Sequence, residues 1–307
     1  MERFDNSGNK SHQKIKLVLK YFSIIAIFII ISTFLLPTII FCRLSKDNDV
    51  ATTMQSLDAV KYNSSSATIV IEQSSKKVLS SNNSRVRLAM ASTTKIMTAL
   101  VVLDNIADVD IQLAIPEQAV GVEGSSVYLR RNEIWSVRDL LYALMLRSGN
   151  DASVALAIAV CGSVQFFVDM MNAKVEELGL KDTHFTNPHG LHDDEHYTTA
   201  YDLAIITAKA MQNPLFKTIV SAKSYVVEGN YTHDKYYFGN KNKMLLMMDG
   251  ADGVKTGYTK NSGRCLVSSA TREGKQLICV VLNVHDMWNV SKNLLEKGFE
   301  QLQNSKA

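Results

Sequence analysis

The stretch MASTTKIMTAL, residues 90–100, places Ser92 three positions before Lys95. Residues three apart lie on the same face of a helix, so a helix here would bring the hydroxyl and the amine together. The same spacing occurs three more times, at Ser7/Lys10, Ser11/Lys14 and Ser74/Lys77. The first two copies lie in a polar tail and the third in a predicted polar turn. Only the Ser92 copy begins a segment whose apolar residues recur at helical spacing.

This pairing has a clear chemical use. A serine hydroxyl is a weak nucleophile until a base removes its proton. A neutral lysine can be that base, and a lysine stays neutral when it is buried or lies beside another cation. The apolar neighbours of Lys95 predict such a semi-buried setting; they are Ile96, Met97, Leu100 and Val101. A nucleophile at a helix start would also have backbone N–H groups close to a developing oxyanion.

A second pair of polar side chains lies in the stretch RSGND, residues 147–151. This stretch interrupts an otherwise helical pattern over residues 136–160. Gly149 is expected to end the first helix, and Asn150 or Asp151 to cap the second. In such a break, the hydroxyl of Ser148 and the amide of Asn150 can point together into a cleft.

The tripeptide Lys-Thr-Gly occurs at residues 255–257, inside DGVKTGYTKNSGRCLVSSA. It precedes a predicted strand, and a free strand edge there could pair with an extended peptide. Lys255 and Thr256 would then bind a carboxylate, and Gly257 would leave room for the substrate.

The remaining pattern predicts an α+β fold with helices packed on an antiparallel sheet. Two β-like runs, SATIVIE and KKVLSS, flank a polar turn, and residues 105–135 suggest short strands. Helices are expected over residues 92–106, 136–160 with the break, 163–180, 198–212 and about 288–303. Two strands are expected at about 264–271 and 276–284.

With these elements in place, residues 66–299 resemble the low-molecular-mass penicillin-binding proteins that are serine D-Ala-D-Ala carboxypeptidases. The three motifs occur in the order known for penicillin-recognising enzymes. Further stretches carry the resemblance: ASTTKIMTALV, LRSGNDASVALA, FVDMMNAKVEELGLKDTHFTNPHGL, TTAYDLA, NKNKMLL and GADGVKTGYT. The resemblance implies a penicillin-recognising serine transferase/β-lactamase-like fold, an antiparallel sheet with helices on both faces and a helical lobe beside the site.

The resemblance also implies a role for each matching residue. Ser92 would be the acylated nucleophile, Lys95 its base and Ser148 a proton relay. The substrate-binding residues would be Asn150, Lys255, Thr256, Gly257 and Tyr258, with the backbone N–H groups of Ser92 and Tyr258 as the oxyanion hole. The substrate would be a peptidoglycan stem peptide ending in D-Ala-D-Ala, and β-lactam antibiotics would be covalent inhibitors. No cofactor and no metal are implied.

The sequence departs from the family pattern in two places. Many relatives carry a further domain and a C-terminal amphipathic anchor, whereas no additional C-terminal domain is expected here. Many also have an arginine near the end of the last strand, where it assists carboxylate binding. Here the segment reads NVHDMWNVSKNLL, without arginine, so another cation would have to assist Lys255 and Thr256.

The N-terminal region predicts attachment to a membrane. Residues 21–42, YFSIIAIFIIISTFLLPTIIFC, carry no charge, and 22 helical residues would span about 33 Å. Lysines are frequent before this run, which predicts a cytoplasmic tail over 1–20 and an extracytoplasmic remainder. A polar tether over 43–66 and a catalytic domain over 67–303 would follow. Cleavage as a signal peptide is the competing hypothesis, although no Ala-x-Ala site follows the run.

Composition excludes little, but it argues against nucleic-acid binding. The 307 residues are 46% hydrophobic and 21% charged, with a net charge of +3. No basic stripe interleaved with aromatic residues is present.

Three other functions remain open at this stage. A β-lactamase would share the nucleophile, but the sequence has no Glu-x-x-Leu-Asn. A catalytically silent peptidoglycan-binding protein would keep the fold alone. The third is a metal site in the loop 184–196, where the candidate ligands are His184, His189, His192, Asp193, Asp194, Glu195 and His196. A polar surface loop is the favoured interpretation of this segment.

Overall fold

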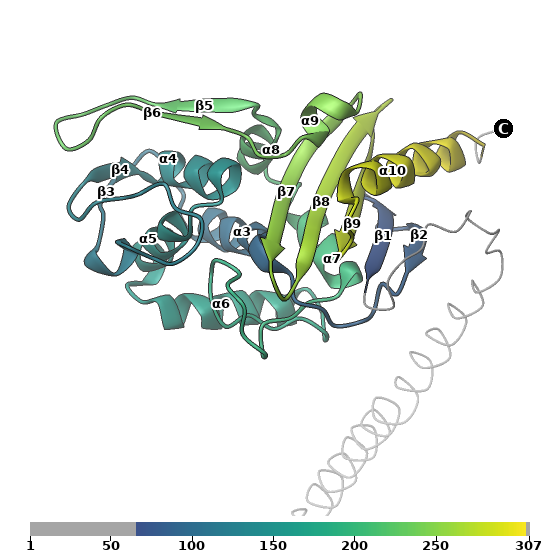
Figure 1. The fold of residues 1–307 in the computed structure, drawn as a ribbon, viewed down its shortest axis with the longest axis horizontal. Coiled ribbons are helices and arrows are strands. Elements are labelled where there is room, and N and C mark those ends of the chain that lie inside the picture. The colour runs from purple at the N-terminus through teal and green to yellow at the C-terminus, as the bar shows by residue number, and fades with distance from the viewer. Residues whose placement is uncertain (1–65, 305–307) are drawn as a thin grey trace, which may run out of the picture. The chain divides into compact units, whose positions relative to one another are not determined.

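A five-stranded antiparallel sheet forms the centre of the fold, with the strand order β2-β1-β9-β8-β7 (Figure 1). The strands are β1 (Ala67–Glu72), β2 (Val78–Asn82), β7 (Ala251–Thr259), β8 (Gly263–Arg272) and β9 (Lys275–Leu282). The predicted hairpin of β1 and β2 is confirmed, and so are the two strands before the last helix. Strand β7 lies at one end of this order, so one of its edges pairs with no other strand of the sheet.

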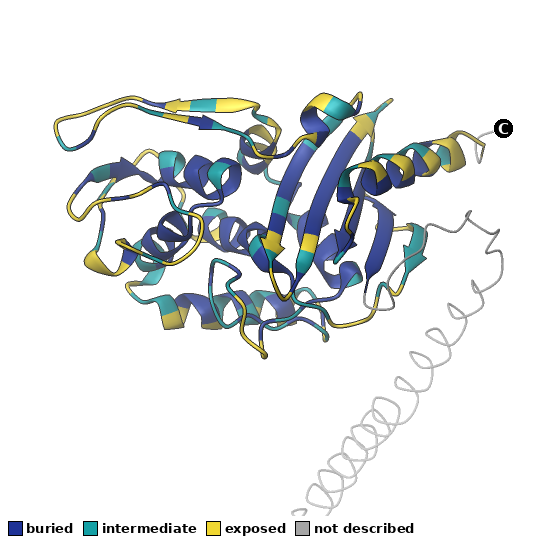
Figure 2. Cartoon of the chain, in the orientation of Figure 1, coloured by how far each residue is buried: buried dark blue, intermediate teal, exposed yellow. Residues whose placement is uncertain are grey.

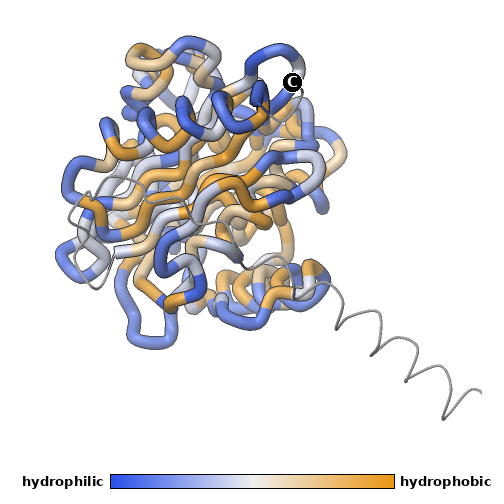
Figure 3. The backbone as a smooth tube through the Cα atoms, turned by 90° about the vertical axis from the view of Figure 1, so that its right-hand side faces the viewer, coloured by the Kyte–Doolittle hydropathy of each residue, from blue (hydrophilic) through white to orange (hydrophobic). Residues whose placement is uncertain are grey.

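Helices pack on both faces of the sheet, as predicted. Helix α10 (Met287–Asn304) contacts β8 and β9, while α7 (Ala200–Ala210) contacts β1 and β9 and packs against α3 (Lys95–Asn105). Two hydrophobic clusters result, one on each face: Ile69 and Val267 belong to the first, Val70 and Leu266 to the second. This alternation follows from the two-residue period of strands. The middle strands are accordingly buried and apolar (Figures 2 and 3).

A helical lobe stands beside the free edge of β7. It contains α4 (Val137–Tyr142), the π-helical η5 (Ala143–Arg147), α5 (Asn150–Cys161) and α6 (Val164–Glu177). Two short strands, β3 (Gln112–Ala114) and β4 (Ile134–Ser136), and the 3₁₀ turn η4 (Glu117–Ala119) complete it, as the turn-rich pattern predicted.

The predicted break between two helices is present, but its residue assignments were wrong. Ser148, not Gly149, adopts the left-handed conformation that ends the first helix, with a φ of +67°. Gly149 is the N-cap of α5, without a side-chain cap, and Asn150 and Asp151 are already helical. The wider π-helical turn of η5 shifts the end of the first helix by one residue, which hydrophobic periodicity does not reveal.

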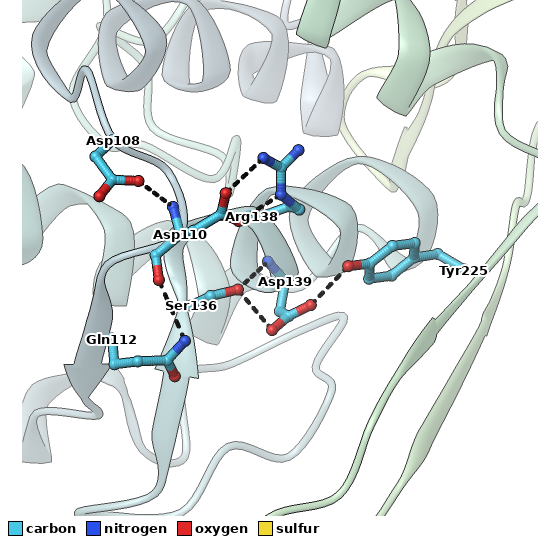
Figure 4. A network of polar contacts seen from close by, with 7 residues as sticks. All are labelled: Asp108, Asp110, Gln112, Ser136, Arg138, Asp139 and Tyr225. Carbon is cyan, nitrogen blue, oxygen red and sulfur yellow. Dashed lines mark hydrogen bonds and ion pairs between the residues drawn. The ribbon is translucent and has the colours of Figure 1, made fainter.

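The segment 211–250 contains elements that the sequence pattern did not predict. They are α8 (Pro214–Ser221), the hairpin of β5 (Ser224–Val227) and β6 (Tyr236–Gly239), and the single turn α9 (Met244–Met247). Figure 4 shows how the hairpin attaches to α4: the hydroxyl of Tyr225 donates to a carboxylate oxygen of Asp139 at 2.8 Å. That carboxylate also accepts from Ser136, so one half-buried acid joins β5 to the start of α4.

This computed structural model describes residues 66–304. The predicted tail and membrane segment, and the tether up to residue 65, lie outside the described residues. Among residues 66–304, no single helix has the length and apolar character needed to cross a membrane, and only α5 and α6 together, bent by 85°, meet those criteria.

Candidate active site

Ser92 and Lys95 meet at the junction of two helical segments. Ser92 lies in the 3₁₀ turn η3 (Ala91–Thr94), and Lys95 is the first residue of α3. A 3₁₀ turn has three residues per turn, so side chains three apart lie directly above one another. Lys95 Nζ is accordingly 3.1 Å from Ser92 Oγ. Lys95 is fully buried, whereas Ser92 is half-buried.

The partners of Lys95 determine which way a proton can move. Besides Ser92, its amine contacts Asn150 Oδ1 at 2.7 Å and the carbonyl of His189 at 2.5 Å. Both of those oxygens can only accept hydrogen bonds. A neutral amine donates its two hydrogens to them and directs its lone pair at the hydroxyl of Ser92. The geometry therefore fits a base that removes the proton of Ser92.

The electrostatic surroundings favour that neutral amine. The pKa of Lys95 lies well below its usual value because the amine is buried, and because Lys255 and Lys241 add positive charge nearby. The carboxylate of Asp151 opposes this shift only in part. Burial and like charge are the two effects that make a lysine a base near neutral pH.

Asn150 is itself held by the loop 123–129. Its side-chain amide donates to the carbonyl of Glu123 at 2.5 Å, and its backbone N–H donates to the carbonyl of Ser125 at 2.7 Å. The carboxylate of Asp151 accepts from the N–H groups of Val127 and Leu129, at 3.0 and 3.1 Å. This buried acid therefore fixes the loop that orients Asn150, and Asn150 in turn contacts Lys95.

Ser148 is brought to the same region by the helix break. It is buried, and its hydroxyl has no hydrogen-bond partner among the described residues. A buried hydroxyl without a partner is unusual in folded proteins. It lies two residues before Asn150, whose side chain contacts Lys95.

The Lys-Thr-Gly motif precedes β8, as predicted, and itself lies within β7, a strand that the sequence pattern did not predict. Lys255 and Gly257 pair with Val267 and Cys265, which belong to the hydrophobic cluster that faces α3. Lys255 is buried and donates to the carbonyl of Thr256 at 2.9 Å. Burial, with a smaller contribution from Lys241, lowers the pKa of Lys255 to about 7.

Gly257 allows β7 to approach the nucleophile turn. A Cβ at this position would lie 3.1 Å from the backbone nitrogen of Ser92, the carbonyl of Met90 and the Cβ of Ala91. The next residue, Tyr258, is 68% exposed. β7, the end strand of the sheet, thus lies against the turn that carries Ser92, with no side chain from Gly257 between them.

The loop 184–196 lies beneath this site and is not a polar surface loop throughout, so that part of the prediction was wrong. The carbonyl of His189 contacts Lys95, and His196 is 3% exposed. Only the stretch 192–195 is exposed. Within residues 66–304, no group of three or more histidine, cysteine, aspartate or glutamate side chains is placed to hold a metal ion.

A family model described as D-alanyl-D-alanine carboxypeptidase, peptidase S11, matches residues 52–286. The chain belongs to this family. The D-alanyl-D-alanine carboxypeptidase DacF of Bacillus subtilis is 38% identical over 218 residues, which cover 69% of this chain and 56% of that protein. The D-alanyl-D-alanine carboxypeptidase of Streptomyces strain K15 is 38% identical over 211 residues, 64% and 72% of the two chains. The chain spans 56% of the length of DacF, and 62% of the length of a further relative, the D-alanyl-D-alanine carboxypeptidase DacA of Haemophilus influenzae.

Solved structures confirm the fold class. A point mutant of the Streptomyces K15 DD-transpeptidase matches with a TM-score of 0.72 and 32% identity, over 76% of this chain and 97% of that one. The D-alanyl-D-alanine carboxypeptidase DacD of Francisella tularensis matches with a TM-score of 0.71 and 29% identity, over 80% and 72%. The family resemblance and the α+β fold inferred from the motifs are therefore confirmed.

Sequence reasoning missed three contributors to this peptidase S11 site. The carbonyl of His189 and the carboxylate of Asp151 orient Lys95 and Asn150, and Lys241 adds positive charge near both buried lysines. The stretches that contain them, NPHGL, SGND and NKNK, resemble the family, but the sequence analysis assigns none of these orienting or electrostatic roles to His189, Asp151 or Lys241. A carbonyl contact carries no side-chain signal, so His189 could not be found by residue type.

The described residues also form a separate open pocket of about 380 Å³, lined by Arg85, Asp182 and Tyr201 among others. None of the eight residues predicted for the peptidase S11 site lines it. The candidate site therefore lies at the free edge of β7 and not in this hollow.

Gly190→Ala is expected to destabilise the fold and slow any reaction of Ser92. Gly190 has a φ of +89°, and a Cβ there would lie 2.0 Å from the carbonyl oxygen of Ala91. Alanine should lower the free energy of unfolding in two ways: by about 1–2 kcal/mol through left-handed backbone strain, and by about 1–3 kcal/mol through overpacking. Urea unfolding measures this loss.

The matched control for this substitution is Gly179→Ala. Gly179 has a similar φ of +70°, but a Cβ there meets nothing within 4 Å. Gly179→Ala should therefore lower the free energy of unfolding by the backbone strain alone, and it should leave the reactivity of Ser92 unchanged. Equal losses of stability in the two variants would contradict the proposed close contact at Ala91.

Proposed function

We propose that this chain is a serine D-Ala-D-Ala carboxypeptidase that removes the terminal D-Ala from peptidoglycan stem peptides. The observation that carries the proposal is the contact of Ser92 Oγ with the buried amine of Lys95 at 3.1 Å. Its other two contacts leave that amine a lone pair for the serine proton. Membership of the peptidase S11 family supports the same reaction.

In the proposed mechanism, neutral Lys95 takes the proton as Ser92 Oγ attacks the carbonyl carbon of the D-Ala-D-Ala bond. The backbone N–H groups of Ser92 and Tyr258 stabilise the oxyanion. Ser148 relays that proton from Lys95 to the departing amine, so D-Ala leaves, Lys95 is neutral again and an ester on Ser92 remains. Water then adds to the ester as Lys95 takes a proton from it. Lys95 returns this proton to Ser92 Oγ, and the shortened peptide leaves with a free carboxylate.

Substrate recognition in this proposal uses β7 and the helix break. The extended peptide pairs with the free edge of β7, and Asn150 binds its amide. Lys255 and Thr256 bind the terminal carboxylate. Lys241 takes the place of the arginine absent from the last strand, because its charge acts on both Lys95 and Lys255.

We further propose that residues 21–42 anchor the protein as a single membrane span, with residues 67–303 as an extracytoplasmic catalytic domain. The support is the uncharged 22-residue run and the lysines that precede it. An extracytoplasmic site is also where peptidoglycan and β-lactam antibiotics would reach Ser92.

The pH dependence of kcat/KM is expected to be bell-shaped. Lys95 must be neutral to act as a base, so the rate rises with pH through its lowered pKa. Lys255 must be protonated to bind a carboxylate, and its pKa is about 7, so the rate falls as pH rises above this value. Such a profile reports the groups of the free enzyme, and it is measured with a D-Ala-D-Ala peptide between about pH 5 and pH 10.

The variant Lys255→Arg separates these two limbs, because arginine remains charged across this range. The alkaline limb should move to higher pH, while the acid limb stays. An unchanged alkaline limb in a folded Lys255→Arg protein would show that another group produces it.

The direct test of the function is release of D-Ala. The full chain in detergent is incubated with a peptide ending in D-Ala-D-Ala, and the products are identified by mass spectrometry. Loss of one terminal residue, with D-Ala in solution, is the expected result. An intact peptide after prolonged incubation would reject the carboxypeptidase and favour a binding protein.

A further inference from the structure

A buried histidine that the proposed reaction does not use lies behind the nucleophile turn. His196 is 3% exposed. It contacts Thr94, which lies in η3 and is fully buried. Ring nitrogen Nε2 of His196 lies 2.8 Å from Thr94 Oγ1. The hydroxyl of Thr94 donates to the carbonyl of Ala91 at 2.8 Å, and Ala91 directly precedes Ser92.

The donor and the acceptor can be assigned for each hydrogen bond that links Thr186, His196, Thr94 and Ala91. The backbone N–H of Thr186 is a donor, and it points at His196 Nδ1 at 3.0 Å. Nδ1 must therefore accept, so the ring is neutral and carries its hydrogen on Nε2. Nε2 donates to Thr94 Oγ1, and the single hydroxyl hydrogen of Thr94 is free for the carbonyl of Ala91. Burial lowers the pKa of His196 to about 4, which keeps this neutral form at physiological pH.

The last acceptor in this series of hydrogen bonds is the carbonyl of Ala91, a residue in an unfavourable backbone conformation. Ala91 has a φ of +48°, in the left-handed region that non-glycine residues rarely adopt. Such a conformation persists only where its surroundings enforce it. Here the backbone of Gly190 closes over the carbonyl of Ala91 from one side, and Thr94 binds it from within the turn.

We propose that His196 is a positioning residue for the nucleophile, acting through Thr94 on the carbonyl of Ala91 to hold the backbone that carries Ser92. The inference rests on the proposed function, in which Ser92 is acylated. The proposal also gives His196, one of the histidines of the loop 184–196, a role that needs no metal. Loss of the Nε2–H donor frees the hydroxyl of Thr94 to turn away, and the turn that presents Ser92 loosens.

The test uses substitutions that separate hydrogen bonding from volume. Thr94→Val keeps the size and removes the hydroxyl, whereas Thr94→Ser keeps the hydroxyl and removes a methyl group. His196→Leu removes both ring nitrogens, whereas His196→Gln offers an oxygen to Thr186 and an N–H to Thr94. Thr207→Val is the matched control, because its buried hydroxyl donates to the carbonyl of Leu203 within α7.

The first readout is the second-order rate constant for acylation of the full chain by a fluorescent penicillin. This rate constant is normalised to the fraction of molecules that mass spectrometry shows to be reactive. Thr94→Val and His196→Leu are expected to lose about 10–100-fold, since displacement of a reacting group by about 1 Å costs about 100-fold. Thr94→Ser, His196→Gln and Thr207→Val should stay within about threefold of wild type. The double variant Thr94→Val/His196→Leu should be no slower than its slower parent, because residues of one network are not additive.

The second readout is hydrogen–deuterium exchange of the segment 90–97, which does not require a reaction. Exchange there should rise at least about tenfold in Thr94→Val and stay at the wild-type rate in Thr94→Ser and Thr207→Val. If wild type does not react with penicillin but this pattern appears, the proposed function fails and the positioning role stands. If folded Thr94→Val exchanges and acylates as wild type does, the positioning role is rejected. Should His196→Leu not fold, the two Thr94 variants decide alone.

Discussion

Wild-type protein incubated with penicillin is expected to gain the mass of one penicillin molecule, and Ser92→Ala is expected to gain none. The β-lactam carbonyl is attacked as the D-Ala-D-Ala bond would be, but the opened ring stays attached and slows hydrolysis. Ser92 Oγ is the hydroxyl in contact with the buried amine of Lys95. Alanine removes the only atom that can form the ester, so the loss should be complete. Intact mass spectrometry of the full chain measures both results.

Ser74→Ala is the matched control for this experiment. Ser74 also precedes a lysine by three positions, Lys77, but its hydroxyl donates to Glu72 at 2.6 Å in the β1–β2 turn. The adduct should therefore persist in Ser74→Ala. An adduct on Ser92→Ala would place the nucleophile elsewhere. A wild-type protein without adduct indicates a silent binding protein if the penicillin remains intact, and a β-lactamase if it is consumed.

Local spacing predicted the part of the site that lies within single elements. The motif at Ser92 and Lys95 required only a helical turn, and the structure supplies one, although it is a 3₁₀ turn. The strands around residues 264–284 and the helices flanking residue 148 followed from periodicity alone. Periodicity did not predict the left-handed conformation of Ser148, because a π-helical turn displaces the helix end by one residue.

The contacts that orient these groups could not be predicted from spacing. The carbonyl of His189 meets Lys95 across 94 positions of sequence, and His196 meets Thr94 across 102. Nothing in the residue types indicates such a pairing, and histidines in a polar run favour a surface loop, with a metal site as the alternative. The need for glycine at position 190 likewise appears only when its distance to the carbonyl of Ala91 is known.

Replacement of Lys95 by methionine is expected to slow acylation by penicillin about 10²–10⁴-fold, the usual contribution of a general base. Methionine fills the buried space of the lysine side chain without an amine. It also leaves Asn150 Oδ1 and the carbonyl of His189 without a donor from this residue, which should lower the free energy of unfolding by about 1–3 kcal/mol for each. Stopped-flow fluorescence gives the acylation rate, and urea unfolding gives the stability.

Two further variants decide whether Lys95 acts as a base or only as a charge. Lys95→Arg keeps donors and a positive charge but cannot become neutral, so it should lose as much rate as Lys95→Met. Lys217→Met, on the exposed face of α8, should acylate as wild type does. If Lys95→Arg retains a rate within about threefold of wild type, the positive charge is what matters, and another group must take the proton of Ser92. If both Lys95 variants lose about the same rate while Lys217→Met does not, the amine that contacts Ser92, Asn150 and His189 is the base, because arginine keeps the charge and the donors but offers no lone pair for the serine proton.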